Sequence, residues 1–328
     1  MKSATVRLGV LSLALLAFAI PLAAHSQPVA KLPRIGVLWQ TAPPPPVHPQ
    51  MNDLLQGLKE LGWEDGKSVV IEYRYGGSQA DRLAAFAAEL VGLKVDVITT
   101  SGDLSTHAAR QATTTIPIVA AVGFPVESGF VKSLARPGGN ITGVAVLADV
   151  LSMKRLELLK DLMPRLSRVA VLWDPVTHER QPKAVEAAAR TLGLQVQILR
   201  AQTPGELAPA FEAAAKARAE ALLVLVSPMF LGNQPTFVNL AARHRIPTIY
   251  DRRIWVESGG LISYGPSDEE RSRLVAGQID RILKGAQPAN LPVQQPTRFE
   301  LSINLKAAKA LGMTISPALL QRADHVIE

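Results

Sequence analysis

The feature that most constrains the fold of this chain is an internal repetition. Three short segments return in the same order about 130 residues later. The segment RIGVLW at 34–39 returns as RVAVLW at 168–173, VITTS at 97–101 returns as LVLVS at 223–227, and IPIV at 116–119 returns as IPTI at 246–249. Two halves built to one plan predict two lobes, and two lobes create a cleft between them.

Each half alternates apolar, β-branched runs with amphipathic segments. Short runs without polar positions are typical of strands buried on both faces, and strands that alternate with helices predict parallel sheets with right-handed crossovers. The fold class is therefore α/β, with two similar doubly wound parallel-sheet lobes. The strands are expected at 35–39, 69–73, 95–99, 118–122, 141–146, 169–173, 195–200, 222–226, 248–250, 261–264 and 299–304. The helices are expected at 53–61, 81–93, 105–112, 182–192, 206–217, 269–283 and 305–311, and 237–244 continues the alternation.

The C-terminal part repeats neither half, which indicates that it joins the lobes. We expect three crossovers, near Ala148, Gly265 and Pro292. One lobe would then comprise residues 33–147 with 265–291, and the other 148–264 with 292–328. Several crossovers form a hinge, and closure about a hinge is a known response to ligand binding.

The first 26 residues predict a secretory signal peptide. Lys2 and Arg7 precede an apolar stretch at 8–22, and small residues at 24 and 26 fit a cleavage site before Gln27. The alternative is an uncleaved anchor, but the apolar stretch is short for a span of about 20 residues. The chain has no cysteine, so no thiol is present at the cleavage site to which a lipid could be attached. We expect a periplasmic protein that is not a lipoprotein.

Composition and motifs exclude several classes of function. Loss of Lys2 and Arg7 lowers the formal net charge from +7 to 7 − 2 = +5, and the remaining basic residues alternate with acids instead of forming a nucleic-acid stripe. The absence of cysteine excludes thiolate metal sites and disulfides. No phosphate-binding glycine motif, serine nucleophile elbow or metal spacing of histidines occurs. We expect no enzyme activity, no metal and no cofactor.

Candidate ligand-binding residues follow the strands, because ligands of open α/β sheets bind beyond the carboxyl ends of the strands. They are Trp39, Gln40, Ser101, Gly102, Phe124, Asp174, Ser227, Tyr250 and Tyr264. Ser101 and Ser227 occupy matching places in the repeat, where a hydroxyl beside a helix N-terminus suits an anionic group. The alternative is that each serine only caps its helix.

The aromatic and acidic candidates have two interpretations each. Trp39, Phe124, Tyr250 and Tyr264 would stack on an apolar or aromatic ligand, or pack between the lobes. Asp174 or Asp103 would face an ammonium group, or serve as a turn or cap residue.

Five motifs resemble those of one group of ABC-transporter substrate-binding proteins, the tryptophan- or tyrosine-type group. They are LARPGGNITG at 134–143, YGPS at 264–267, QPTRFELSINLK at 295–306, AKALG at 308–312 and RAD at 322–324. The resemblance runs from about Arg34 to the end of the chain. It implies a type I periplasmic-binding fold with three crossovers and a ligand at the lobe interface.

The resemblance also implies a function. The protein would capture a small organic solute, such as an amino acid or a related compound, and deliver it to an ABC permease that a separate ATPase drives. Phe124 stands where relatives usually carry an aspartate, and Asp174 where they tend to carry an asparagine. The resemblance therefore leaves the identity of the solute open. We expect a monomer. The alternatives are a periplasmic sensory module or a periplasmic enzyme using Asp174 or Asp103.

Overall fold

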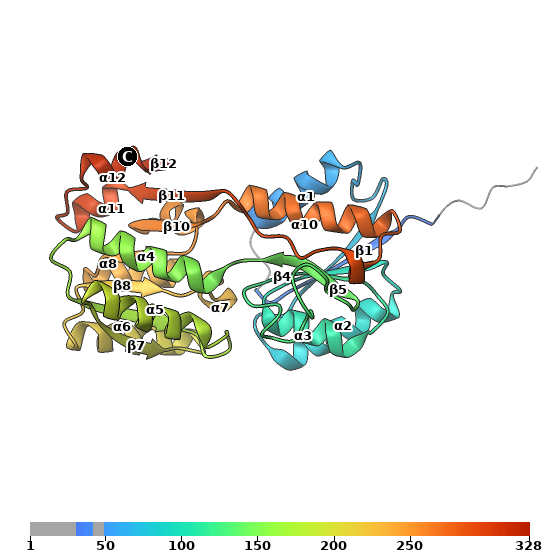
Figure 1. The fold of residues 1–328 in the computed structure, drawn as a ribbon, viewed down its shortest axis with the longest axis horizontal. Helices are drawn as coiled ribbons and strands as arrows, with labels where there is room; N and C mark the ends of the chain where they lie inside the picture. Colours follow the sequence, from blue (N-terminus) through green and yellow to red (C-terminus); the bar gives the residue numbers. More distant parts are fainter. Residues whose placement is uncertain (1–30, 42–48) are drawn as a thin grey trace, which may run out of the picture. The chain divides into compact units, whose positions relative to one another are not determined.

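The computed structural model describes residues 31–41 and 49–328, and Leu32–Glu328 form one compact unit (Figure 1). The signal peptide expected at 1–26 lies outside the described residues. Two sheets organise the unit. Within the described residues, no helix combines the length and the apolar character that crossing a bilayer requires.

The first sheet has five parallel strands in the order β2-β1-β3-β4-β5. Alternate residues of its strands point to opposite faces. Leu38 and Ile98 pack with α2 and α3 on one face, while Ile35 and Val37 pack with α1 and α10 on the other. The elements of this first lobe are β1 (Arg34–Trp39), α1 (Pro49–Glu60), β2 (Val70–Tyr75), α2 (Ala80–Gly92), β3 (Val97–Ser101), α3 (Asp103–Ala112), β4 (Ile118–Val122), β5 (Ile141–Ala145), α10 (Asp268–Leu283) and η2 (Pro288–Asn290).

The second sheet has seven strands in the order β12-β11-β10-β9-β8-β6-β7. All neighbours are parallel except β10 and β11, which are antiparallel. The strands of this second lobe are β6 (Arg168–Trp173), β7 (Gln195–Arg200), β8 (Ala221–Val224), β9 (Thr248–Tyr250), β10 (Ile262–Pro266), β11 (Phe299–Asn304) and β12 (His325–Ile327). The helices are α4 (Ala148–Leu162), α5 (Arg180–Leu192), η1 (Pro204–Glu206), α6 (Leu207–Lys216), α7 (Pro228–Leu231), α8 (Gln234–His244), α9 (Arg253–Glu257), α11 (Leu305–Ala310) and α12 (Pro317–Gln321).

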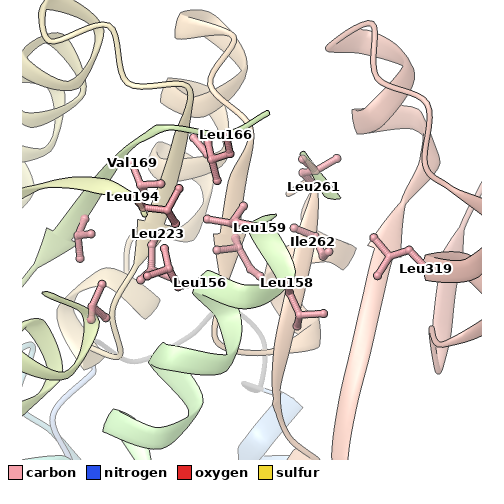
Figure 2. Close-up of a cluster of buried hydrophobic side chains, with 14 of the residues drawn as sticks. Leu156, Leu158, Leu159, Leu166, Val169, Leu194, Leu223, Leu261, Ile262 and Leu319 are labelled. Atoms are coloured by element: carbon pink, nitrogen blue, oxygen red, sulfur yellow. The ribbon is translucent and has the colours of Figure 1, made fainter. Parts of the chain in front are cut away.

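The core of the second lobe lies on both faces of its sheet. Figure 2 shows the cluster in which Leu156 and Leu159 of α4 pack against Val169 and Leu223 of the strands. The opposite face holds Phe211, Phe237 and Trp255 from α6, α8 and α9.

The chain passes between the two sheets after β5, after β10 and before β11. Helix α10 follows a strand of the second sheet, but it packs against α1 and contacts β3, β4 and β5 (Figure 1). Gln294 pairs with Val144 of β5 before the chain continues into β11. These crossovers confirm the predicted fold class of two α/β lobes.

Several elements differ from the sequence-based expectation. Helix α4, which fills 148–162, was not predicted, and neither were α7, α9, α12 and β12. Helix α1 begins at Pro49 instead of 53, and β3 ends at Ser101 instead of 99. The antiparallel β11 has a topological reason: it arrives from the first lobe in an extended connection, without the crossover helix that a parallel neighbour requires.

Candidate functional site

A cavity between the two sheets collects residues from the carboxyl ends of their strands. The space among its lining atoms, open solvent included, measures about 690 Å³. The first lobe contributes Gln40, Ser101, Gly102, Asp103, Gly123 and Phe124. The second lobe contributes Val176, His178, Gln181, Val226, Ser227 and Arg252. Arg271 of α10 also lines the cavity, and so do apolar residues such as Val122, Val146 and Leu231.

Gly102 shapes the first-lobe side of the cavity, at the junction of β3 and α3. Its φ of +95° with ψ of 160° is a backbone conformation that only glycine adopts easily. Gln40, which is buried, accepts a hydrogen bond from the Leu104 amide at 3.1 Å. This bond fixes the side chain that follows β1 against the start of α3.

Asp174 and Ser227 form the matching element in the second lobe. The Ser227 hydroxyl donates to Asp174 Oδ2 at 2.6 Å, and the Val176 amide donates to Asp174 Oδ1 at 3.0 Å. The Ser227 hydroxyl also accepts from the Met229 and Phe230 amides and so caps α7. Burial raises the pKa of Asp174, and the Ser227 hydrogen bond opposes that shift.

Asp103 is the carboxylate that lines the cavity itself. It occupies the first turn of α3. Burial raises the pKa of Asp103 to about 6, and a hydrogen bond with Ser128 partly offsets the effect.

Phe124 and Arg180 link the two lobes at the cavity. The Phe124 ring, from the loop after β4, lies 4.8 Å from the His178 ring between centroids. The Arg180 guanidinium lies 5.6 Å over the same ring and forms an ion pair with Glu127, which follows Phe124 in the first lobe. A second ion pair joins Arg180 to Asp149 at 3.0 Å.

Arg252 and Arg271 bring positive charge to the cavity from different lobes. Arg252 follows β9 and pairs with Asp251 at 3.0 Å and with Asp268 at 3.5 Å. Arg271 pairs with the same Asp268 at 2.7 Å. With its amide oxygen turned toward them, Gln50 of α1 accepts hydrogen bonds from both arginines. Burial would raise the pKa of Asp251, but the charges of Arg252 and Arg155 reverse the shift and lower it.

The described residues contain no group of three His, Asp or Glu side chains arranged to hold a metal ion.

Comparisons with known proteins identify the family to which the chain belongs. The family model described as "ABC transporter substrate binding protein" matches residues 44–327. The chain belongs to that family.

A curated relative and two solved structures agree with this membership. The chain is 30% identical over 275 residues to a tyrosine-binding protein of Clostridioides difficile, covering 81% of this chain and 78% of the relative. It is 26% identical, with a TM-score of 0.83, to a conserved domain protein from Vibrio cholerae, covering 90% of this chain and 100% of that one. It is 25% identical, with a TM-score of 0.80 and the same coverages, to an ABC domain from Streptococcus pneumonia solved in complex with L-Trp.

The cavity of this substrate-binding protein brings together six of the candidate residues from the sequence. They are Gln40, Ser101, Gly102, Asp103, Phe124 and Ser227. Asp174 is buried behind the lining and reaches the cavity only through its bond to Ser227. Ser227 caps α7 with its side chain, as the alternative interpretation predicted. Ser101 caps no helix, because it is the last residue of β3 and Gly102 takes the cap position of α3.

The other three aromatic candidates lie elsewhere. Tyr250 is fully buried and stacks on Trp255 with 4.7 Å between centroids, because its side chain points into the core of the second lobe. Tyr264 stacks on Phe299 and offers its carbonyl to Arg155. Trp39 lines a smaller neighbouring pocket that shares Ser101 and Arg271 with the main cavity.

Sequence reasoning did not single out His178, Gln181, Arg252 or Arg271. Tyr250 was selected because ligands of open α/β sheets bind beyond the carboxyl ends of the strands. Arg252 follows the carboxyl end of β9, so this strand-end rule also applies to Arg252. Arg271 carries no such signal, because its place depends on the return of α10 to the first lobe.

Proposed function

We propose that this substrate-binding protein captures a small organic solute, an amino acid or a related compound, in the cavity between its lobes. It then delivers the solute to an ABC permease that a separate ATPase drives. The observation that carries the proposal is the convergence of strand ends from both sheets on one cavity. Ser101 and Gly102 come from the first lobe, and Ser227 and Arg252 from the second.

The lining of the cavity supports a small organic ligand. It combines apolar side chains with a few placed polar groups, as small-molecule sites usually do. The printed names of two relatives, a tyrosine-binding protein and a domain in complex with L-Trp, support an amino acid or a related compound. Within this proposal, Gln40, Ser101, Gly102, Phe124 and Ser227 contact the solute, and Asp174 positions Ser227.

Solute capture in this proposal includes movement of the lobes. The lobes comprise residues 33–147 with 265–291 and residues 148–264 with 292–328. The Glu127–Arg180 ion pair and the Phe124–His178 ring contact link them across the cavity, and opening of the lobes would break both contacts. A solute that touches both lobes binds the closed arrangement more tightly and shifts the population toward it.

The location and partners complete the proposal. Residues 1–26 direct export and are removed, and the mature protein acts in the periplasm as a monomeric carrier without a lipid, a cofactor or an enzymatic step. N-terminal sequencing of the protein from a periplasmic fraction tests this, and we expect it to begin at Gln27.

The central experiment is a thermal-shift screen on protein that has been unfolded and refolded to remove any bound solute. The panel contains amino acids, their deaminated acids, purines and sugars. A solute that binds only the folded state stabilises it by about 2.7 kcal/mol at a hundredfold excess over Kd. We expect at least one solute to raise Tm by several degrees, with Kd then measured by calorimetry. No shift with any solute would contradict the proposed function.

A further inference from the structure

Two arginines that line the cavity have N–H groups without a hydrogen-bond acceptor among the described residues. The exposed fractions of Arg252 and Arg271 are only 8% and 7%, yet both line the cavity. Their bonds to Asp251, Asp268 and Gln50 use Nε and Nη1 of Arg252 and Nη2 of Arg271. Among the described residues, no acceptor bonds Nη2 of Arg252, or Nε or Nη1 of Arg271. Each guanidinium therefore keeps N–H groups that can donate a charge-assisted hydrogen bond to a ligand carboxylate.

The buried charges around these arginines are not balanced. Arg252, Arg271 and the fully buried Arg155 face two buried or mostly buried carboxylates, Asp251 and Asp268. Arg155 Nη2 has no hydrogen-bond partner within the described part of the chain. Asp53 is only half-buried; it lines a groove together with Asp268, and its charge also acts on Arg271. A buried cation without a counter-ion is costly, so an anion at this end of the cavity would be stabilised.

The lining offers a single carboxylate to an ammonium group. Among the described residues that line the cavity, Asp103 is the one acid. Asp174 lies behind the lining, and both of its oxygens accept hydrogen bonds from Ser227 and Val176. Most of the remaining lining is apolar, from Phe124 and Val122 to Val176 and Leu231.

We propose that the solute is an apolar carboxylate, such as an aromatic or branched aliphatic acid, whose carboxylate binds between Arg252 and Arg271 and which needs no ammonium group. This inference rests on the proposed function and narrows its solute class. The two arginines come from different lobes, so a carboxylate that bonds both favours closure.

The test uses matched probes that differ only in their charged groups. One set is L-phenylalanine, 3-phenylpropanoate and 2-phenylethylamine; the other is L-leucine, 4-methylpentanoate and 3-methylbutylamine. Each set contains an amino acid, the same compound without its ammonium group and the same compound without its carboxylate. Calorimetry on the refolded protein measures the affinities. We expect the acid of at least one set to bind as tightly as its amino acid or more tightly, and the amine to bind at least tenfold more weakly.

The outcomes separate this inference from the proposed function. An amine that binds as well as its acid, or an amino acid that binds tenfold more tightly than its acid, would overturn the inference and leave the proposed function standing. The same holds if all six probes fail while a purine or a sugar of the thermal-shift panel binds. If another amino acid or deaminated acid of that panel binds, the comparison is repeated with its own matched acid, amino acid and amine, and the same criteria apply. If no solute of any kind binds, both proposals fail.

Variants on α10 provide a second test. Arg271→Met keeps most of the side-chain volume but removes the donors, and we expect it to weaken the acid at least tenfold. Arg273→Met is the control, since Arg273 lies on the same helix, is about half exposed and pairs with Glu60 and Glu269 away from the cavity. If Arg271→Met fails to fold, the probe sets on the unmodified protein still decide. Equal losses in both variants would count against the arginine site.

Discussion

Gly102 of the first lobe lies directly against Pro228 of the second. A Cβ placed on Gly102 would come within 2.9 Å of Pro228 Cγ, and closer still to the amide oxygen of Gln40. Gly102 ends the β3–α3 junction, and Pro228 is the first residue of α7. The absence of a side chain at Gly102 therefore allows the β3–α3 junction of the first lobe to contact the start of α7 in the second lobe.

Replacement of Gly102 by alanine should impair closure of the lobes. The added methyl group would have to displace Pro228 from the opposite lobe or the Gln40 side chain beside it, so the closed arrangement loses stability relative to the open one. We expect the affinity for the solute found in the screen to fall at least tenfold, as measured by calorimetry.

Gly62→Ala is the matched control. Gly62 has a similar φ, +91° against +95°, but a Cβ there meets nothing within 4 Å. Both variants should lose about 1–3 kcal/mol of unfolding free energy from backbone strain, but only Gly102→Ala should lose affinity. A normal affinity in Gly102→Ala would show that the contact with Pro228 is irrelevant to binding.

The ion pair between Arg180 and Glu127 should hold the lobes together weakly. The side chains are 46% and 37% exposed, and exposed ion pairs contribute about 0.2–1 kcal/mol each. We expect Arg180→Gln to weaken solute binding about two- to fivefold by calorimetry at low salt, and the difference from the unmodified protein to shrink at high salt because the pair is screened.

Lys183→Gln removes the same charge from the same helix, but Lys183 pairs with Glu179 in its own lobe. It should leave the affinity unchanged. A comparable loss in Lys183→Gln would attribute the effect to the net charge of α5 instead of the link between the lobes.

Much of the fold could be predicted because the strands are buried on both faces. Continuous apolar runs such as 169–173 and 118–122 matched their strands within one residue at either end. Helix α4 escaped prediction for a related reason. Its buried side includes the polar residues Ser152 and Arg155, and the apolar Val150 on the other side is exposed. The sequence therefore lacks the clean apolar face that identifies a surface helix.

The site was only partly predictable from the sequence. The strand-end rule located Gln40, Ser101, Gly102, Phe124 and Ser227, because the rule depends only on where parallel strands finish. It does not say which way a side chain turns, and Tyr250 turns into the core. Arg271 comes from a helix that crosses back to the first lobe, and that placement depends on tertiary packing.

The bond between Ser227 and Asp174 should contribute measurably to stability. Ser227→Ala removes a charge-assisted hydrogen bond from a buried carboxylate and also removes the cap of α7. We expect a loss of about 2–3 kcal/mol in the free energy of unfolding, measured by urea denaturation without ligand.

Ser316→Ala isolates the contribution of capping. Ser316 caps α12 through a bond from the Leu319 amide, and within the described part of the chain it has no carboxylate partner. Its loss should cost about 1 kcal/mol. Equal losses in the two variants would mean that the Asp174 bond adds nothing to stability.

Asp103 should make the protein less stable as the pH rises from about 4 to 6. Burial raises the pKa of Asp103 from 3.8 to about 6, so the folded state holds its proton more tightly than the unfolded state. The folded state therefore gains stability below this range and loses it as the pH rises through it. A difference of about 2 pKa units corresponds to about 3 kcal/mol. Asp103→Asn carries no charge, so it should raise the unfolding free energy at pH 7 and flatten its dependence on pH between 4 and 6.

Denaturant unfolding of the ligand-free protein across that pH range measures the slope. Asp81→Asn serves as the control, because Asp81 is exposed at the start of α2 and its removal should leave the slope unchanged. A profile of Asp103→Asn parallel to that of the unmodified protein would show that this carboxyl is solvated in the folded state. A solvated Asp103 carboxylate would also offer a partner in the cavity to an ammonium-bearing solute.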